Sequence, residues 1–239
     1  MDSNMDNSEK DTTAPLRGIH TYVLRAGRMT EAQRRDYEIH SARWSLPFRE
    51  TILNFTDVYE NTQPVTIEIG FGMGKATAII AENNPERNYL GIEVHRAGVG
   101  RLLGEIEKRN LTNVRIIEYD AIEVLHSMIP DGSVSAFHIF FPDPWPKKRH
   151  HKRRLVQRPR TDLMAQKLAP GGYIYMATDW EPYGEEAYIE LTATAGLESM
   201  YEGFAPRQSW RPETRFEEKG LKANHEICEL MFRKKAQAD

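Results

Sequence analysis

The sequence predicts an α/β fold whose centre is a doubly wound, mostly parallel β-sheet covered by helices on both faces. The first observation is that short β-rich runs alternate with stretches of helical spacing over most of the chain. The second is that the connections between these segments are short, as in parallel strands joined by crossover helices. A chain of 239 residues fits one such domain with additions or two small ones, and we predict a single domain.

The pattern locates the main elements in order. Strands are expected at residues 65–69, 89–93, 114–117, 134–140, 173–177 and 227–232. Helices are expected between them, at residues 76–83, 102–106, 122–129, 163–168 and 188–194. Proline and glycine predict turns before the fourth strand, at residues 130–133, and before the fifth, at residues 170–172.

The N-terminal part differs in composition from the rest. Residues 1–35 are predicted to form a flexible, polar and basic extension, and residues 36–239 the folded domain. A helix is expected to begin near Thr30, because Thr30 and Gln33 have the spacing of a capping box.

Cysteine content and charge indicate the environment of the protein. No stretch approaches the length of a membrane span, and residues 1–13 are acidic and polar, unlike a signal peptide. A single cysteine, Cys228, excludes an internal disulfide, so we expect a cytoplasmic protein. The net charge of −3 hides a cluster of bases at residues 147–160, which suits a polyanionic partner.

Glycines and acids follow the first three predicted strands, where a sheet of this kind binds ligands. Gly70, Gly72 and Gly74 let a ligand approach the backbone closely. Glu93 closes the second strand, about twenty residues after these glycines, where an acid hydrogen-bonds ribose hydroxyls. Asp120 closes the third strand, within reach of an adenine edge. Each motif alone is equally well explained by a tight turn or a surface acid, but together at one sheet edge they favour a nucleotide-type pocket.

Two details separate the possible cofactors. The glycine spacing is G-x-G-x-G, which differs from the G-x-G-x-x-G of dinucleotide enzymes. Glu68 precedes these glycines, and its charge would repel a pyrophosphate but favour the ammonium and sulfonium groups of S-adenosylmethionine. A P-loop is excluded, because its first glycine would fall on Ile69 and Ala76 replaces its Ser or Thr.

The fourth predicted strand ends in a proline-rich corner, FFPDPWPKKR at residues 140–149. Its prolines hold the corner rigid because they fix φ. The corner presents one carboxylate, Asp143, and one indole, Trp145. Trp145 either stacks on an extruded base or packs beneath the loop, and we favour packing. Proline precedes the acid, which argues against the Asn/Asp-Pro-Pro-aromatic corner of N6-adenine or N4-cytosine methyltransferases.

A dense cationic run follows this corner. Runs of charged residues usually form solvent-exposed faces, but this one contains no acid and adjoins the proline-rich corner with Asp143. We therefore expect RNA-phosphate contacts from Arg149, His150, His151, Lys152, Arg153 and Arg154. The two histidines are expected to face solvent without a metal, since no Cys/His spacing suggests zinc. The basic N-terminal segment either orders on RNA or is a solvated tail, and both remain open.

Several segments closely resemble the bacterial tRNA (guanine-N7-)-methyltransferase family. They are EIGFGMG (68–74), GIEVH (91–95), FPDPW (141–145), KRR (152–154), ATDW (177–180) and TRFE (214–217). The resemblance runs from about residue 25 to residue 232. It implies the Rossmann-like, seven-stranded sheet of class I S-adenosylmethionine-dependent methyltransferases. It also implies methylation of guanine N7 at position 46 in the variable loop of tRNA.

The resemblance also implies roles for residues. Cofactor binding falls to Glu68, Gly70, Gly72, Gly74, Glu93 and Asp120, and substrate binding to Lys147, Asp179, Thr214, Arg215, Phe216 and Glu217. Residues 214–217 would otherwise pass for a loop-like surface turn, and the resemblance implies that they close over the guanosine. The family commonly has lysine at Arg215, and a guanidinium offers different hydrogen-bond geometry.

The implied chemistry agrees with the residues. Guanine N7 carries an in-plane lone pair and no proton, so the transfer needs no strong general base, and none is visible at these strand ends. Asp143 is assigned positioning and electrostatic stabilisation of the charge that develops on the purine. We expect a monomer or weak homodimer that binds tRNA and no metal. On the residues alone, a nicotinamide dehydrogenase and a non-catalytic RNA-binding protein remain as alternatives.

Overall fold

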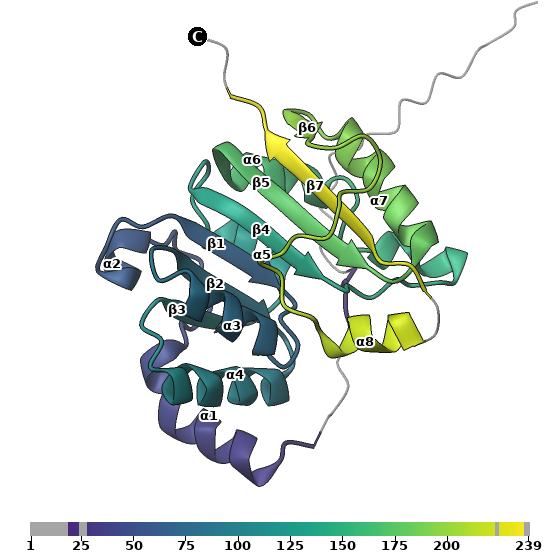
Figure 1. Ribbon diagram of the computed structural model, residues 1–239. Helices are drawn as coiled ribbons and strands as arrows, with labels where there is room; N and C mark the ends of the chain where they lie inside the picture. The colour runs from purple at the N-terminus through teal and green to yellow at the C-terminus, as the bar shows by residue number, and fades with distance from the viewer. Residues whose placement is uncertain (1–18, 24–27, 223–224, 237–239) are drawn as a thin grey trace, which may run out of the picture.

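The computed structural model describes residues 19–23, 28–222 and 225–236, and a seven-stranded sheet forms its centre (Figure 1). The strand order is β3-β2-β1-β4-β5-β7-β6. The strands are β1 (Val65–Ile69), β2 (Asn88–Glu93), β3 (Val114–Glu118), β4 (Val134–Phe140), β5 (Leu168–Thr178), β6 (Leu197–Ser199) and β7 (Cys228–Lys234). β1 to β5 pair in parallel, whereas β7 is antiparallel to β5 and β6. The predicted doubly wound, mostly parallel sheet is confirmed.

Helices cover both faces of the sheet (Figure 1). They are α1 (Glu31–Trp44), α2 (Phe55–Tyr59), α3 (Lys75–Asn83), α4 (Arg96–Arg109), α5 (Ala121–Ser127), α6 (Arg160–Lys167), α7 (Glu181–Ala193), α8 (Arg215–Lys222) and the 3-10 helix η1 (Lys148–Arg153). One apolar core joins the sheet to α3 and α4, and a second joins it to α5, α6 and α7. Strands β1 and β2 are buried along their whole length, as expected for strands covered on both faces.

The predicted capping box at Thr30 is present. The Gln33 amide donates to Thr30 Oγ1 at 3.3 Å, and the Thr30 amide donates to Gln33 Oε1 at 2.8 Å. α1 packs closely along α4, because a Cβ added at Gly100 would overlap the Gln33 carbonyl oxygen. Residues 1–18, which make up much of the predicted extension, lie outside the described residues.

The structure differs from the sequence expectations where elements are short or irregular. The expected turn at residues 170–172 lies inside β5, where it forms a bulge between the pairs Val134–Leu168 and Ala136–Tyr173. The stretch at 214–217, expected to be loop-like, instead contributes the first turn of α8. Elements as short as α2 and β6 leave no clear periodicity in the sequence. Within the described ranges, the structure contains no helix long and apolar enough to span a bilayer.

Candidate active site

The glycine loop, residues 70–74, connects β1 to α3 at the carboxyl edge of the sheet. Gly70, Gly72 and Gly74 all have positive φ, of +73°, +57° and +69°, which other residues rarely adopt. A Cβ at Gly70 or Gly72 would meet no atom within 4 Å, whereas one at Gly74 would lie 2.6 Å from Leu102 Cβ. The first two glycines therefore leave open space for a ligand, and the third lets α3 pack on α4.

Glu68 lies buried in β1 directly before the glycine loop. Glu68 is 3 % exposed. In the sheet register it lies between Gly91 of β2 and His138 of β4. Burial raises the pKa of Glu68 to about 7; the Thr77 hydroxyl opposes this shift and the charge of Glu93 adds to it. A neighbouring cation would stabilise this carboxylate. The site thus fits the positively charged S-adenosylmethionine that the sequence predicts.

Glu93 closes β2 and is tied to the same loop. Its Oε2 accepts from the Gly72 amide at 2.8 Å, and its Oε1 accepts from the amides of Val94 at 2.7 Å and His95 at 3.0 Å. A carboxylate offers about four acceptor positions, so one is left for a ligand such as a ribose hydroxyl. The structure brings Glu68 and Glu93 together at the loop, as the sequence predicts.

Asp120 has a structural role beside its predicted one. Its Oδ1 caps α5 by accepting from the amides of Ile122 at 2.8 Å and Glu123 at 3.4 Å. Its Oδ2 lies 3.2 Å from His20 Nδ1, and the carboxylate contributes with burial to raising the pKa of Tyr22 to about 12. His20 and Tyr22 thus border the proposed adenine side. Neither residue could be predicted from the sequence, because no local pattern marks them.

The proline-rich corner after β4 is strained and partly buried. Phe141 and Trp145 have φ of +52° and +46°, which is unusual for bulky side chains. Trp145 is only 9 % exposed: its indole N–H donates to the Thr21 carbonyl at 3.2 Å, and Arg153 lies 4.3 Å above its ring. These contacts agree with the packing interpretation. Asp143 is exposed, and no described residue forms a hydrogen bond or ion pair with it.

The basic run forms η1, in which some side chains are exposed to solvent and others pack against Trp145. Lys147, Arg149 and Lys152 are exposed, and Arg153 and His150 lie against Trp145. His150 has a pKa lowered by desolvation and then by the nearby cations, with Arg149 and Arg153 first among them. The accumulated positive charge suits a phosphate backbone.

Arg154 requires a correction to the predicted RNA contacts. It is 1 % exposed, forms an ion pair with Glu186 of α7, and donates to the Pro144 carbonyl at 2.9 Å. It cannot reach a phosphate without breaking these contacts. Glu186 also lies 3.4 Å from His151, so the run, which lacks acids in sequence, is partly neutralised by α7.

Asp179, the predicted substrate residue after β5, lies against α8. A Cβ at Gly220 would be 2.9 Å from Asp179 Cβ, and His225 Nδ1 lies 3.9 Å from Asp179 Oδ2. Thr214 and Glu217 cap α8 reciprocally: the Glu217 amide donates to Thr214 Oγ1 at 3.1 Å, and the Thr214 amide to Glu217 Oε2 at 3.4 Å. The side chains of Arg215 and Phe216 lie outside the described part of the structure.

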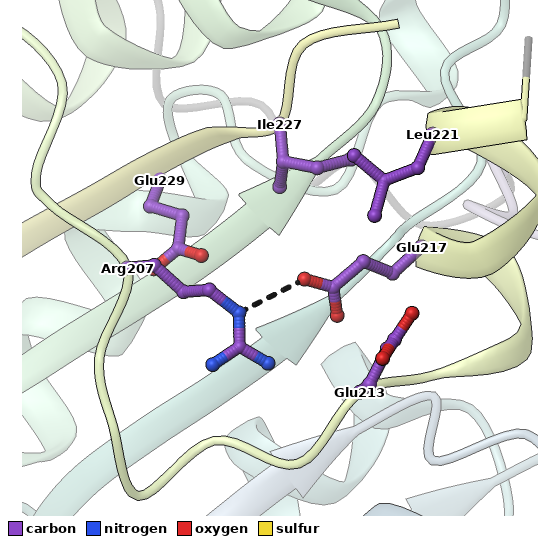
Figure 2. Close-up of a pocket in the computed structure, with 6 residues that line it drawn as sticks. All are labelled: Arg207, Glu213, Glu217, Leu221, Ile227 and Glu229. Carbon is purple, nitrogen blue, oxygen red and sulfur yellow. Dashed lines mark hydrogen bonds and ion pairs between the residues drawn. The ribbon is translucent and has the colours of Figure 1, made fainter. Parts of the chain in front are cut away.

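A pocket of about 330 Å³ lies beside α8 rather than at the glycine loop (Figure 2). It is lined by Arg207, Glu213, Glu217, Leu221, Ile227 and Glu229. Of these only Glu217 was predicted to bind substrate. For the residues that the structure describes, no group of three or more His, Cys, Asp or Glu side chains is placed to bind a metal ion.

The solved structures that this chain resembles show the fold. It superposes on the 16S rRNA methyltransferase KamB with a TM-score of 0.56 and 16% identity, over 76% of this chain and 92% of that one. It superposes on the [4+2]-cyclase SpnF with a TM-score of 0.51 and 17% identity, over 76% and 80%.

Sequence comparisons show the family. A family model described as a putative methyltransferase matches residues 62–230. The tRNA (guanine-N(7)-)-methyltransferases of Nitrosospira multiformis and Chromobacterium violaceum are 45% and 46% identical to this chain, over 93% and 92% of it and 97% of each relative. That of Francisella philomiragia is 44% identical over 96% of this chain and 99% of the relative. The chain therefore belongs to the tRNA (guanine-N(7)-)-methyltransferase family.

Proposed function

We propose that this protein transfers the methyl group of S-adenosylmethionine to N7 of guanine in tRNA, forming 7-methylguanosine at position 46 of the variable loop. The observation that carries the proposal is the placement of two acids at the carboxyl ends of two neighbouring strands. Glu68 is buried near the end of β1, and Asp143 is exposed just after β4, the strand paired with β1. Relatives that bear this activity in their names align over most of the chain.

The cofactor side is assigned to the glycine loop and the acids around it. S-adenosylmethionine, when bound, supplies a methyl group on a positively charged sulfur. The buried Glu68 balances positive charge, the open backbone at Gly70 and Gly72 contacts the ligand, and Glu93 uses its remaining acceptor position for a ribose hydroxyl. Asp120 borders the adenine side through Oδ2.

The substrate side is assigned to Asp143 and the residues facing it. Because N7 carries a lone pair and no proton, the protein orients the purine rather than removing a proton. Orientation of this kind can lower a barrier by roughly 7–11 kcal/mol. Asp143 accepts from the Watson–Crick edge and stabilises the positive charge that moves onto the purine. Lys147, Asp179 and the start of α8, including Arg215 and Phe216, hold the nucleoside.

The RNA backbone is assigned to the exposed part of η1. Arg149, Lys152 and Arg153 neutralise phosphates on either side of the methylated guanosine. His150 and His151 border the same surface and contact the RNA without adding charge. A monomer or weak homodimer in the cytoplasm is part of the same proposal. The folded domain is taken to begin with α1 at Glu31 rather than at residue 36, because α1 packs along α4.

The test is transfer of labelled methyl from S-adenosylmethionine to unmodified bulk tRNA, followed by nucleoside analysis. The expected product is labelled 7-methylguanosine. A single tRNA transcript in which position 46 is changed from guanine should accept no label. Label in another nucleoside would overturn the substrate assignment but keep the cofactor assignment. Binding of S-adenosylhomocysteine without any transfer would favour a non-catalytic RNA-binding protein, and binding of NAD instead would favour a dehydrogenase.

A further inference from the structure

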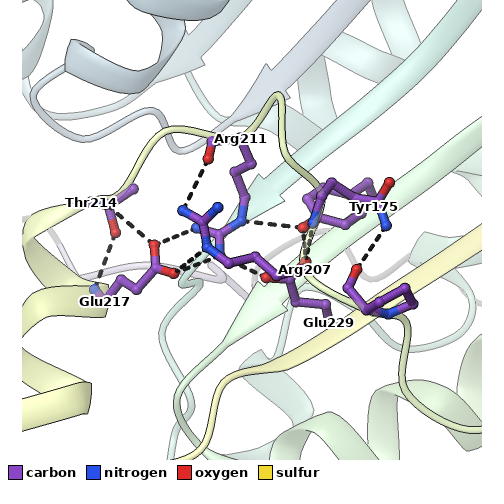
Figure 3. Close-up of polar contacts among 8 residues, drawn as sticks. Tyr175, Arg207, Arg211, Thr214, Glu217 and Glu229 are labelled. Carbon is purple, nitrogen blue, oxygen red and sulfur yellow. Dashed lines mark hydrogen bonds and ion pairs between the residues drawn. The ribbon is translucent and has the colours of Figure 1, made fainter.

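A buried polar network joins α8 to strands β5 and β7 (Figure 3). Its centre is Arg211, which is 1 % exposed. Arg211 donates to both oxygens of Glu217, at 2.6 and 2.8 Å, to Glu229 Oε1 at 2.6 Å, and to the Tyr175 hydroxyl at 3.2 Å. Tyr175 in turn donates to Glu229. A single guanidinium thus connects α8, β5 and β7.

Glu217 has its acceptor positions filled by the protein itself. Its Oε1 accepts from Arg211 and from Arg207 Nε at 3.1 Å. Its Oε2 accepts from Arg211 and from the Thr214 amide at 3.4 Å. A carboxylate has about four acceptor positions, so none is left for a nucleoside. Burial raises the pKa of Glu217, but the two arginines outweigh it and lower the pKa overall. Glu217 therefore stays ionised inside the network.

Arg211 also lies beside the proline-rich corner after β4. Its guanidinium carbon lies 5.8 Å from the centre of the Phe141 ring, and Phe141 precedes Pro142 and Asp143. The same helix that Arg211 holds through Glu217 contacts Asp179 farther along, at Gly220. Arg211 thus lies beside the corner after β4 and holds α8 through Glu217, and α8 in turn contacts the end of β5 at Asp179.

We infer that Arg211 is a positioning residue for the methyl transfer, acting through Glu217 to hold the first turn of α8 against the Phe141–Asp143 corner. Glu217 is then a support for Thr214 and its neighbours, and it makes no contact with the guanosine. The inference rests on the proposed function, because it assumes that α8 and Asp143 face the same nucleoside.

The chemistry of arginine explains why this position needs it. The planar guanidinium has five N–H donors in a rigid fork, and four of them serve three partners here. The lysine ammonium has three donors at one point, so it cannot bond both Glu217 oxygens, Glu229 and Tyr175 at once. Arg211→Lys therefore keeps the positive charge but loses some of these hydrogen bonds, so it separates the effect of the geometry from that of the charge.

The experiment compares Arg211→Lys, Glu217→Gln and the double variant, with Arg233→Lys as the matched control. Arg233 is an exposed arginine paired with Glu198 on β6, away from α8. Each variant is measured for kcat and KM with tRNA, for S-adenosylhomocysteine affinity and for thermal unfolding. Both single variants are expected to lower kcat/KM for tRNA at least tenfold and to keep S-adenosylhomocysteine affinity within twofold. The double variant is expected to match the worse single variant, because both changes break one contact.

Other outcomes overturn the inference. They are tRNA kinetics of a folded Arg211→Lys protein within twofold of wild type, loss of S-adenosylhomocysteine affinity in parallel with activity, or single effects that multiply in the double variant. If Arg211→Lys does not fold, the same measurements on Glu217→Gln, which are tRNA kinetics, S-adenosylhomocysteine affinity and thermal unfolding, test the inference. Absence of 7-methylguanosine with the wild-type protein would instead refute the proposed function.

Discussion

The amide of Gly72 donates a 2.8 Å hydrogen bond to Oε2 of Glu93, which ties the glycine loop after β1 to the end of β2. The bond crosses the edge where the cofactor is proposed to bind, so the loop and the ribose-side acid form one unit. The unit is backed by α4, because Gly98 lies directly against the Gly72 carbonyl group. The shape of the pocket thus depends on residues outside the glycine motif.

Gly98→Ala is expected to weaken cofactor binding. The added Cβ would overlap the Gly72 carbonyl oxygen, and backbone on both sides has little room to move. We expect at least a tenfold loss of S-adenosylhomocysteine affinity by calorimetry and a loss of roughly 1–3 kcal/mol in the free energy of unfolding. Gly104→Ala in the same helix is the control, because the three atoms nearest to its added Cβ belong to the flexible Asp36 side chain rather than to backbone. Equal affinities for the two variants would contradict the role of this contact.

Glu68→Gln is expected to stabilise the ligand-free protein at high pH and to weaken S-adenosylmethionine binding. Burial raises the pKa of Glu68 to about 7 from the ordinary glutamate value of 4.5. Below about pH 4.5 the group is protonated in both the folded and unfolded states. As the pH rises from about 4.5 to 7, the unfolded chain ionises while the folded carboxyl stays protonated, so the wild-type fold loses up to about 3 kcal/mol relative to the unfolded chain.

The glutamine of the variant does not ionise, so the variant does not lose this stability at high pH. The two proteins should therefore have similar unfolding free energies near pH 5 and differ at pH 8. Urea unfolding at both pH values measures the difference, and calorimetry measures the affinity. A wild-type protein that is no less stable than the variant at pH 8 would show that the buried carboxyl carries no such cost.

Asp143→Asn is expected to lower kcat on the order of 100-fold, a loss comparable to that of one electrostatic group in other active sites. Asp143 is exposed at the corner and has no partner among the described residues, so the change should leave the fold intact. S-adenosylhomocysteine affinity should stay within twofold, since the residue belongs to the substrate side. An equal loss of turnover and affinity would move Asp143 to the cofactor side.

The double variant Arg149→Gln/Lys152→Gln is expected to reduce the salt dependence of tRNA binding. Each phosphate contact contributes about 0.7–0.9 to the slope of log affinity against log salt, so the slope should fall by about 1.4–1.8. Both side chains are exposed, and thermal stability should not change. An unchanged slope would identify this run as a solvated surface.

Arg154→Gln is expected to behave in the opposite way. It breaks the ion pair between the buried Arg154 and the partly exposed Glu186 and removes the donor to the Pro144 carbonyl, so the free energy of unfolding should fall by about 1–3 kcal/mol. The salt slope of tRNA binding, measured below the melting temperature, should stay that of wild type. A reduced slope would return Arg154 to the RNA contacts.

The sequence by itself determined the sheet, the glycine loop and the acids at the strand ends. These features are local: strand periodicity, positive φ at alternate glycines and an acid closing a strand can be recognised within a few residues. Glu68, Glu93 and the Phe141–Asp143 corner were predictable for that reason, and parallel strands then bring their carboxyl ends to one edge.

Only the tertiary structure decided the roles of side chains whose partners are distant in sequence. Arg154 looks like its basic neighbours, yet it is buried and paired with Glu186, 32 residues away. Arg211 carries no motif, and its function depends on Tyr175, 36 residues earlier, and on Glu229 after α8. Burial and ion pairing are set by which segments pack together, and a charged residue carries no local pattern that distinguishes a solvated side chain from a buried one.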